Sequence, residues 1–197
     1  MNKTRLEAFS DGVLAIIITV MVLEIKIPHG ADWAELKPLI PTFLSYLLSF
    51  VYIAIYWGNH HHMLHSLKSV SSGIIWANMN LLFWLSLIPF STGWMGENNF
   101  APNTILVYGV LLLASGVSFV VLQKQIEKHV QDIDALKMAF ANMKKKGIIS
   151  TMVYASAIPF AYVSPIISGI LFLAMAIIWL IPDKNIEKAL TEKNDEQ

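Results

Sequence analysis

The sequence has no cysteine, and only 14% of its 197 residues are charged. Without cysteine, the chain forms neither disulfide bonds nor thiolate metal sites. Basic and acidic residues number 14 each, and this balance argues against a nucleic-acid partner. Apolar residues make up 55% of the chain, and its mean hydropathy is +0.56. These values indicate a membrane protein rather than a soluble domain.

Catalytic and metal-binding motifs are also missing. A histidine-rich segment over 59–65 contains no aspartate or glutamate, and the sequence has no His-Glu-x-x-His motif. The pairs His61/His65 and His62/His65 have spacings that can bind one divalent ion. Metal binding and pH sensing therefore stay open for this cluster, and interfacial packing is favoured over both. We expect no enzyme activity, no resident metal and no cofactor.

Apolar stretches of about 20 residues predict an all-α membrane protein with six membrane-spanning helices. Glycine, proline and polar turns set their limits. The resulting six-helix membrane domain covers 1–182, followed by a charged tail over 183–197. The predicted helices are about 4–27, 38–60, 73–94, 103–123, 147–162 and 164–181, and Pro89 kinks or ends the third.

The distribution of positive charge predicts how these helices cross the membrane. With six spans both termini share a side, and 12 of the 14 Lys and Arg residues lie there. Only Lys26 and Lys37 lie on the other side. By the positive-inside rule, both termini are predicted to be cytoplasmic. The protein itself is expected to reside in the cell membrane. The lysine-rich segment 124–146 is expected to form an interfacial helix, and its charge is interpreted as topogenic rather than lipid-specific.

The first helix carries the most informative pattern, because charged residues precede a long apolar run. At about 100° per residue, a narrow stripe falls within about 60° of Ile16. Ser10 lies about 120° and Asp11 about 140° from Ile16 on the same wheel. Charges at such a depth require partners inside a bundle or a water-filled path. The stripe consists of Phe9, Gly12, Ile16, Thr19, Val20 and Leu23.

These residues resemble a known family. The first helix is similar to the signature of the bacterial branch of the transmembrane protein 175 potassium channels. The similar residues are Arg5-x-x-x-Phe9-Ser10-Asp11, its continuation Gly-Val-x-Ala-Ile-x-Ile-Thr and the following Leu-Glu-Ile-Lys-Ile-Pro. The resemblance continues in Tyr56-Trp57-x-x-His60-His61, in Asn80-Leu81 and in Pro89-Phe90, and it extends to the six-span layout.

The resemblance implies a potassium-conducting pore at the axis of a homotetramer embedded in lipid. Each subunit contributes its first helix, and the Thr-Val-Gly-Tyr-Gly filter of ordinary potassium channels is absent. When the family pattern is carried onto this sequence, it implies that Ile16 forms the pore constriction and that Thr19 forms a ring of hydroxyl groups. Gly12, Val20 and Leu23 continue the wall. Glu24, near the outer end of the helix, either concentrates cations at the pore mouth or is a solvated interfacial charge.

The remaining polar residues are expected to tie the first helix to its neighbours. Arg5, Ser10 and Asp11 would bond to side chains on the second and third helices rather than coordinate ions. The candidate partners are Trp57, His60, His61 and Asn80.

Three alternatives remain on the sequence alone: a proton-permeable channel, a secondary cation transporter and a membrane-embedded enzyme. A transporter favours broken helices and a polar midplane site, and Asp11 is the only acid well associated with a span.

Overall fold

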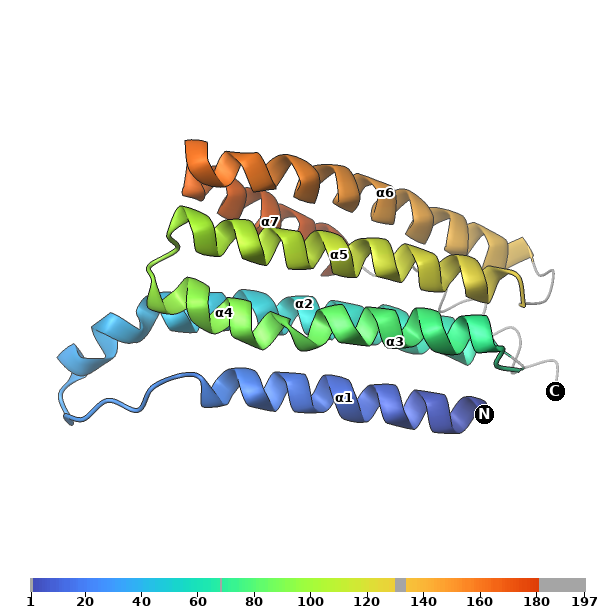
Figure 1. Ribbon diagram of the computed structural model, residues 1–197, viewed down its shortest axis with the longest axis horizontal. Coiled ribbons are helices and arrows are strands. Elements are labelled where there is room, and N and C mark those ends of the chain that lie inside the picture. The colour runs from blue at the N-terminus through green and yellow to red at the C-terminus, as the bar shows by residue number, and fades with distance from the viewer. Residues whose placement is uncertain (1, 68, 130–133, 181–197) are drawn as a thin grey trace.

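The computed structural model describes residues 2–67, 69–129 and 134–180, and all the regular secondary structure within them is helical. Six rods run side by side along one axis (Figure 1), with α3 and α4 joined end to end as a single rod. The predicted all-α fold class is confirmed. The helices are α1 (Lys3–Leu23), α2 (Ile40–His65), α3 (Ser72–Ser86), α4 (Ile88–Glu97), α5 (Pro102–Glu127), α6 (Asp134–Val163) and α7 (Pro165–Leu180), with a short 3-10 helix η1 (Trp33–Leu39) before α2.

Four stretches of the described chain are long and apolar enough to cross a membrane: 3–23, 33–65, 72–97 and 102–127. The last two rods are α6, with 30 residues, and α7, an apolar helix of 16 residues. They form an antiparallel pair that packs on α5 (Figure 1). The predicted tail, with Lys184, Lys188 and Lys193, lies outside the described residues, as does Lys68.

Local sequence explains where several helices begin and break. The Asn2 side chain accepts a hydrogen bond from the Thr4 amide and caps α1. Proline occupies the first turn of α4, α5 and α7, where its missing N–H removes no helical hydrogen bond. Pro89 is the second residue of α4, just after the break at Leu87, and the α3–α4 rod continues past it.

The lysine-rich segment differs from the expected interfacial helix. Residues 124–127 extend α5, and residues 134–146 form the first half of α6, continuous with its apolar half. Gly147, which is predicted from the sequence to begin this helix, lies inside it. A Cβ at Gly147 would come within 3.1 Å of Val120 Cγ2, so glycine serves here to let α5 pack closely. Propensity alone gives no sign of that contact.

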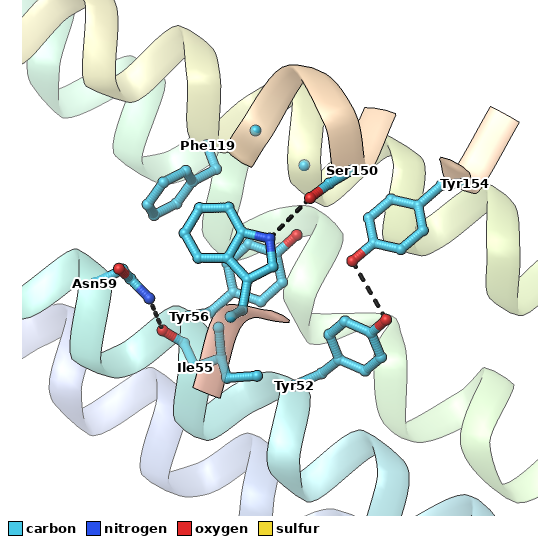
Figure 2. Close-up of a pocket in the computed structure, with 10 residues that line it drawn as sticks. Tyr52, Ile55, Tyr56, Asn59, Phe119, Ser150 and Tyr154 are labelled. Carbon is cyan, nitrogen blue, oxygen red and sulfur yellow. Dashed lines mark hydrogen bonds between the residues drawn. The ribbon is translucent and has the colours of Figure 1, made fainter. Parts of the chain in front are cut away.

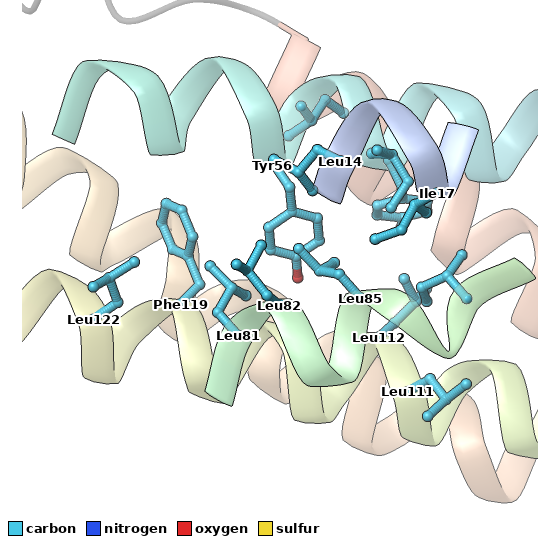
Figure 3. Packing of buried hydrophobic residues seen from close by; sticks show 14 of the residues in the cluster. Leu14, Ile17, Tyr56, Leu81, Leu82, Leu85, Leu111, Leu112, Phe119 and Leu122 are labelled. Atoms are coloured by element: carbon cyan, nitrogen blue, oxygen red, sulfur yellow. The ribbon is translucent and has the colours of Figure 1, made fainter. Parts of the chain in front are cut away.

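The core is built from apolar side chains of all seven α-helices, several of which are shown in Figure 3. Leu14 and Ile17 of α1 meet Tyr56 of α2 and leucines of α3 and α5 there. α2 and α4 approach most closely at Gly96, where a Cβ would lie 2.5 Å from the Thr42 Cα. Packing of this kind, together with interhelical hydrogen bonds, is what holds helices together in lipid.

Candidate functional site

α1 has one face buried in its own subunit and another left uncovered. The buried positions repeat at intervals of three or four residues: Leu6, Ser10, Leu14, Ile17 and Met21. On the opposite side Ile16 is 61% exposed and Leu23 80% exposed. Every residue of the predicted stripe lies on the exposed side, namely Phe9, Gly12, Ile16, Thr19, Val20 and Leu23.

A directional chain of hydrogen bonds ties the buried face of α1 to α2 and α3. Ser10 Oγ donates to the Leu6 carbonyl at 2.8 Å and accepts from Asn78 Nδ2 at 2.9 Å. Asn78 Oδ1 is then left to face His60 Nε2 at 2.6 Å, so His60 must donate from this nitrogen. All three side chains are at most 1% exposed. The other ring nitrogen, His60 Nδ1, is buried without a partner among the described residues.

Asp11 is held separately, at the edge of the buried face. Trp57 Nε1 on α2 donates to Asp11 Oδ1 at 3.0 Å. The Trp57 ring stacks on His61, and His61 stacks in turn on His65, with 6.0 Å between ring centroids in each pair. The carboxylate therefore serves as a tether between helices in this subunit, and it points away from Ile16 on the helix.

Two expected partners lie elsewhere. Asn80 does not reach α1, because its amide donates to Ser118 Oγ of α5 at 2.7 Å. Asn78, which the sequence analysis missed, takes the place expected for Asn80. Two residues along a helix is a rotation of about 200°, so the two asparagines face opposite ways. Arg5 is exposed and makes no hydrogen bond or ion pair with the described residues, in contrast to its expected bracing role.

The histidine-rich segment does not form a metal cage within the described part of the chain. His60 is turned toward Asn78, whereas His61 is stacked between Trp57 and His65. No group of three His, Asp or Glu side chains is placed there to hold a metal ion.

Thr19 is the polar residue on the exposed stripe. Its hydroxyl donates to the Ile16 carbonyl at 2.9 Å, three residues back along the helix. The proton is thereby used within α1, and the oxygen lone pairs remain available as acceptors. A neutral oxygen acceptor on an otherwise apolar face suits a partly dehydrated cation.

An open groove of about 610 Å³ runs between α1 and α4 at the end of the bundle that holds the η1 helix. Its α1 wall includes Ile16, Val20 and Glu24, and its α4 wall includes Phe90 and Trp94. The Glu24 side chain passes over Gly93, where a Cβ would lie 3.6 Å from its Oε2. The groove therefore begins at the exposed stripe and leads to a carboxylate.

An ion pair joins α1 to α4 at the same end. Lys26 Nζ lies 2.7 Å from Glu97 Oε1. The hydrogen bond and charge of Glu97 raise the pKa of Lys26 above its ordinary value of 10.5. α1 is consequently fastened at this end by Lys26 and at the other by Lys3, which donates to the His65 carbonyl at 2.7 Å.

A separate internal cavity of about 30 Å³ lies between α2, α5, α6 and α7 (Figure 2). Tyr154 donates to Tyr52 at 3.3 Å beside it, and Trp179 Nε1 donates to Ser150 Oγ at 2.7 Å. The volume has room for one or two water molecules. None of its lining residues comes from α1, so the cavity is distinct from the exposed stripe.

Comparison with known proteins adds to this geometry. A family model described as endosomal/lysosomal potassium channel TMEM175 matches residues 5–89. A protein of Chryseobacterium sp. named as a potassium channel is 48% identical over 192 residues, which are 98% of this chain and 100% of that protein. The chain belongs to the TMEM175 family. The match contains nearly all of α1, from Arg5 onward, and its partners on α2 and α3, so the predicted family is confirmed.

A solved structure agrees with the fold. The crystal structure of a lysosomal potassium-selective channel TMEM175 homolog from Chamaesiphon minutus has a TM-score of 0.80 and 28% identity, and the alignment covers 91% of this chain and 96% of that chain. The human relative, named an endosomal/lysosomal proton channel, is 36% identical over 100 residues, which are 44% of this chain but 19% of the human protein. TMEM175 proteins are ion channels, so the chain is a membrane channel protein and not an enzyme.

Proposed function

We propose that this TMEM175 protein is the subunit of a potassium-selective channel whose pore is lined by the exposed stripe of α1. Two relatives that match 98% and 67% of the chain are named as potassium channels. The observation that carries the proposal is the pair of faces on α1. One is locked into the subunit by Ser10 and Leu14, and the other leaves Ile16 and Thr19 uncovered by the chain itself.

A homotetramer gives this uncovered face a role. Four copies arranged around an axis would bring four α1 stripes together and leave the α1–α4 groove of each subunit open to a neighbour. Phe90 is 64% exposed in that groove, and α1 presents Ile16 and Val20 to it. Such apolar surface, concave and beside the proposed axis, suits contact with another subunit or with lipid.

The chemistry of the stripe supports cation conduction without a carbonyl filter. Four Ile16 side chains would form an apolar neck that an ion crosses only after losing part of its hydration shell. Potassium holds its water less tightly than sodium, so the neck favours potassium. Thr19, one turn away, would offer four hydroxyl oxygens to the dehydrated ion. Glu24 would attract cations at the outer mouth.

The orientation follows from the charges. Both chain termini are proposed to be cytoplasmic and the protein to reside in the cell membrane, because the lysines gather at the end where α1 begins and α5 ends. At the opposite end the described basic side chains are Lys26 and Lys37, and Lys26 is paired with Glu97. Membrane lipid is then the second partner of the chain, besides its own copies.

Proton conduction through the same pore is the second candidate, because the human relative is named a proton channel. A secondary cation transporter remains the third, and it differs in its kinetics. A channel passes unitary currents, whereas a carrier shows saturable counterflow without them.

Reconstitution in liposomes tests the proposal. Under a potassium gradient with sodium on the opposite side, single-channel currents should reverse near the potassium equilibrium potential. Reversal near the proton equilibrium potential would favour the second candidate, and counterflow without unitary steps would favour a carrier.

The Ile16→Asn variant should conduct more and select less, because a polar amide wets the neck. The control is Val22→Asn, since Val22 is 46% exposed but lies about 120° from Ile16 on the helix. If Ile16→Asn leaves both flux and selectivity unchanged, Ile16 is not at the neck.

A further inference from the structure

Four exposed lysines gather at one end of the bundle, on two neighbouring helices. Lys124 and Lys128 close α5, and Lys144 and Lys145 lie in the first half of α6. The two helices are antiparallel, and this end of both is on the same side of the molecule (Figure 1). Gln123 Nε2 donates to the Phe140 carbonyl at 2.8 Å, which holds the end of α5 against the first half of α6.

On each helix the lysines continue an exposed apolar strip. On α5 the strip passes from Val117 and Val121, 46% and 41% exposed, to Lys124 and Lys128 at intervals of three and four residues. This spacing keeps all four side chains on one helix face.

The strip on α6 has the same order. Met152 and Ile149 are 67% and 42% exposed, and Lys145 follows one turn further toward the lysine-rich end. One turn is about 5.4 Å, so the ammonium groups begin where the lipid-facing surface stops. Long lysine stems can then extend along the apolar surface and place the charge among headgroups.

A tryptophan on α7 lies beside the lysines of α6. The Lys146 ammonium lies 5.7 Å from the centre of the Trp179 ring, whose Nε1 donates to Ser150. Tryptophan is enriched where the hydrocarbon layer meets the headgroups. Residues 144–146 therefore lie at headgroup depth.

The four exposed lysines also have no acidic partner within the described part of the chain. Among the described residues, the structure shows no carboxylate paired with any of them. Glu127 lies on the same end of α5, but its Oε1 accepts a hydrogen bond from Gln123 Nε2 at 2.7 Å. Four ammonium groups at one end of the bundle, next to lipid-facing strips, complement the phosphates of an anionic bilayer surface.

We propose that this lysine face, formed by Lys124, Lys128, Lys144 and Lys145, binds the phosphate headgroups of anionic phospholipids. A charge that served only to orient the chain would need to lie on the cytoplasmic side, with no requirement that it continue a lipid-facing apolar strip. The proposal rests on the membrane placement of the helices and is independent of which ion the pore conducts.

Native mass spectrometry of the purified protein in detergent tests the proposal without any dependence on membrane insertion. The protein is titrated with palmitoyl-oleoyl phosphatidylglycerol and, separately, with the phosphatidylcholine that has the same acyl chains. The phosphatidylglycerol should bind more tightly. Each lysine near an anionic surface contributes about fivefold in affinity, so Lys144→Gln with Lys145→Gln should weaken this binding about 25-fold.

Two matched double variants serve as controls. Lys144→Arg with Lys145→Arg should keep the preference, and Lys26→Gln with Lys37→Gln, the same loss of charge at the other end, should keep it too. Equal binding of the two lipids, or an unchanged preference in the Lys144/Lys145 glutamine variant, would overturn the proposal. Displacement of the lipid by inorganic phosphate at equal concentration would overturn the assignment to a membrane lipid.

Discussion

The hydrogen-bond chain from His60 through Asn78 to Ser10 should stabilise the position of α1, and its energy can be tested by a double-mutant cycle. Asn78→Leu keeps the size of the side chain but removes two hydrogen bonds, of 2.6 and 2.9 Å. It also leaves the His60 Nε2 proton buried and unpaired. Such an orphaned group costs about 1–3 kcal/mol, so the variant should lose about 2–3 kcal/mol of unfolding free energy.

Ser10→Ala removes the acceptor of Asn78 Nδ2 and should cost about 1–2 kcal/mol. Once Asn78 is gone, Ser10 has already lost that partner, so the double variant should be less destabilised than the sum by about 1 kcal/mol. Interhelical hydrogen bonds in membrane proteins reach this size at the upper end of measured couplings.

The assay is reversible unfolding in mixed micelles, followed by circular dichroism. Ser86→Ala is the control for loss of a serine hydroxyl, because Ser86 donates only to the Phe83 carbonyl within its own helix. Strict additivity of Ser10→Ala and Asn78→Leu would refute the chain as an energetic unit.

Three further perturbations follow from the contacts. Asp11→Ala removes the acceptor of Trp57 and should prevent a stable tetramer on a sizing column; a normal tetramer peak would show that the tether is dispensable. Gly96→Ala places a Cβ 2.5 Å from the Thr42 Cα and should destabilise by about 2 kcal/mol, whereas Gly169→Ala, which meets nothing within 4 Å, should not; equal melting temperatures would contradict the close approach. Lys26→Gln removes the partner of Glu97. Because the folded pKa of Lys26 is raised, the stabilisation is complete below 10.5 and lost as pH rises through the higher folded value, so wild type and variant should differ in melting temperature at pH 8 and converge at strongly alkaline pH. A difference that persists there would be due to something other than the ion pair.

The phase of α1 was predictable because a 3.6-residue period fixes which side chains share a face. Ser10 is buried and Ile16 exposed, as the helical wheel predicts. The same rule fails on α3, which is apolar on all sides and gives no preferred face. Asn78 and Asn80 are both plausible there, and only the packed structure shows that Asn78 faces α1 while Asn80 faces α5.

The extent of α6 was not predictable for a related reason. From the sequence, Gly147 is predicted to begin a helix. In the structure, its lack of a side chain lets α6 pack closely against Val120 of α5. Helix propensity is a local quantity and is overridden by such tertiary contacts. Which surface faces a pore depends in turn on how other copies of the chain assemble. The sequence of one subunit has no pattern that predicts the number of copies.

The absence of cysteine makes the central claim directly testable, because a single introduced cysteine needs no background substitutions. The measurement is block of potassium current by silver ions in the reconstituted Ile16→Cys channel, with Val22→Cys as the control. If Ile16 lines the axis, silver should abolish the Ile16→Cys current and leave the Val22→Cys current intact. An Ile16→Cys channel that conducts unchanged in silver would contradict the assignment of the exposed α1 stripe to the pore.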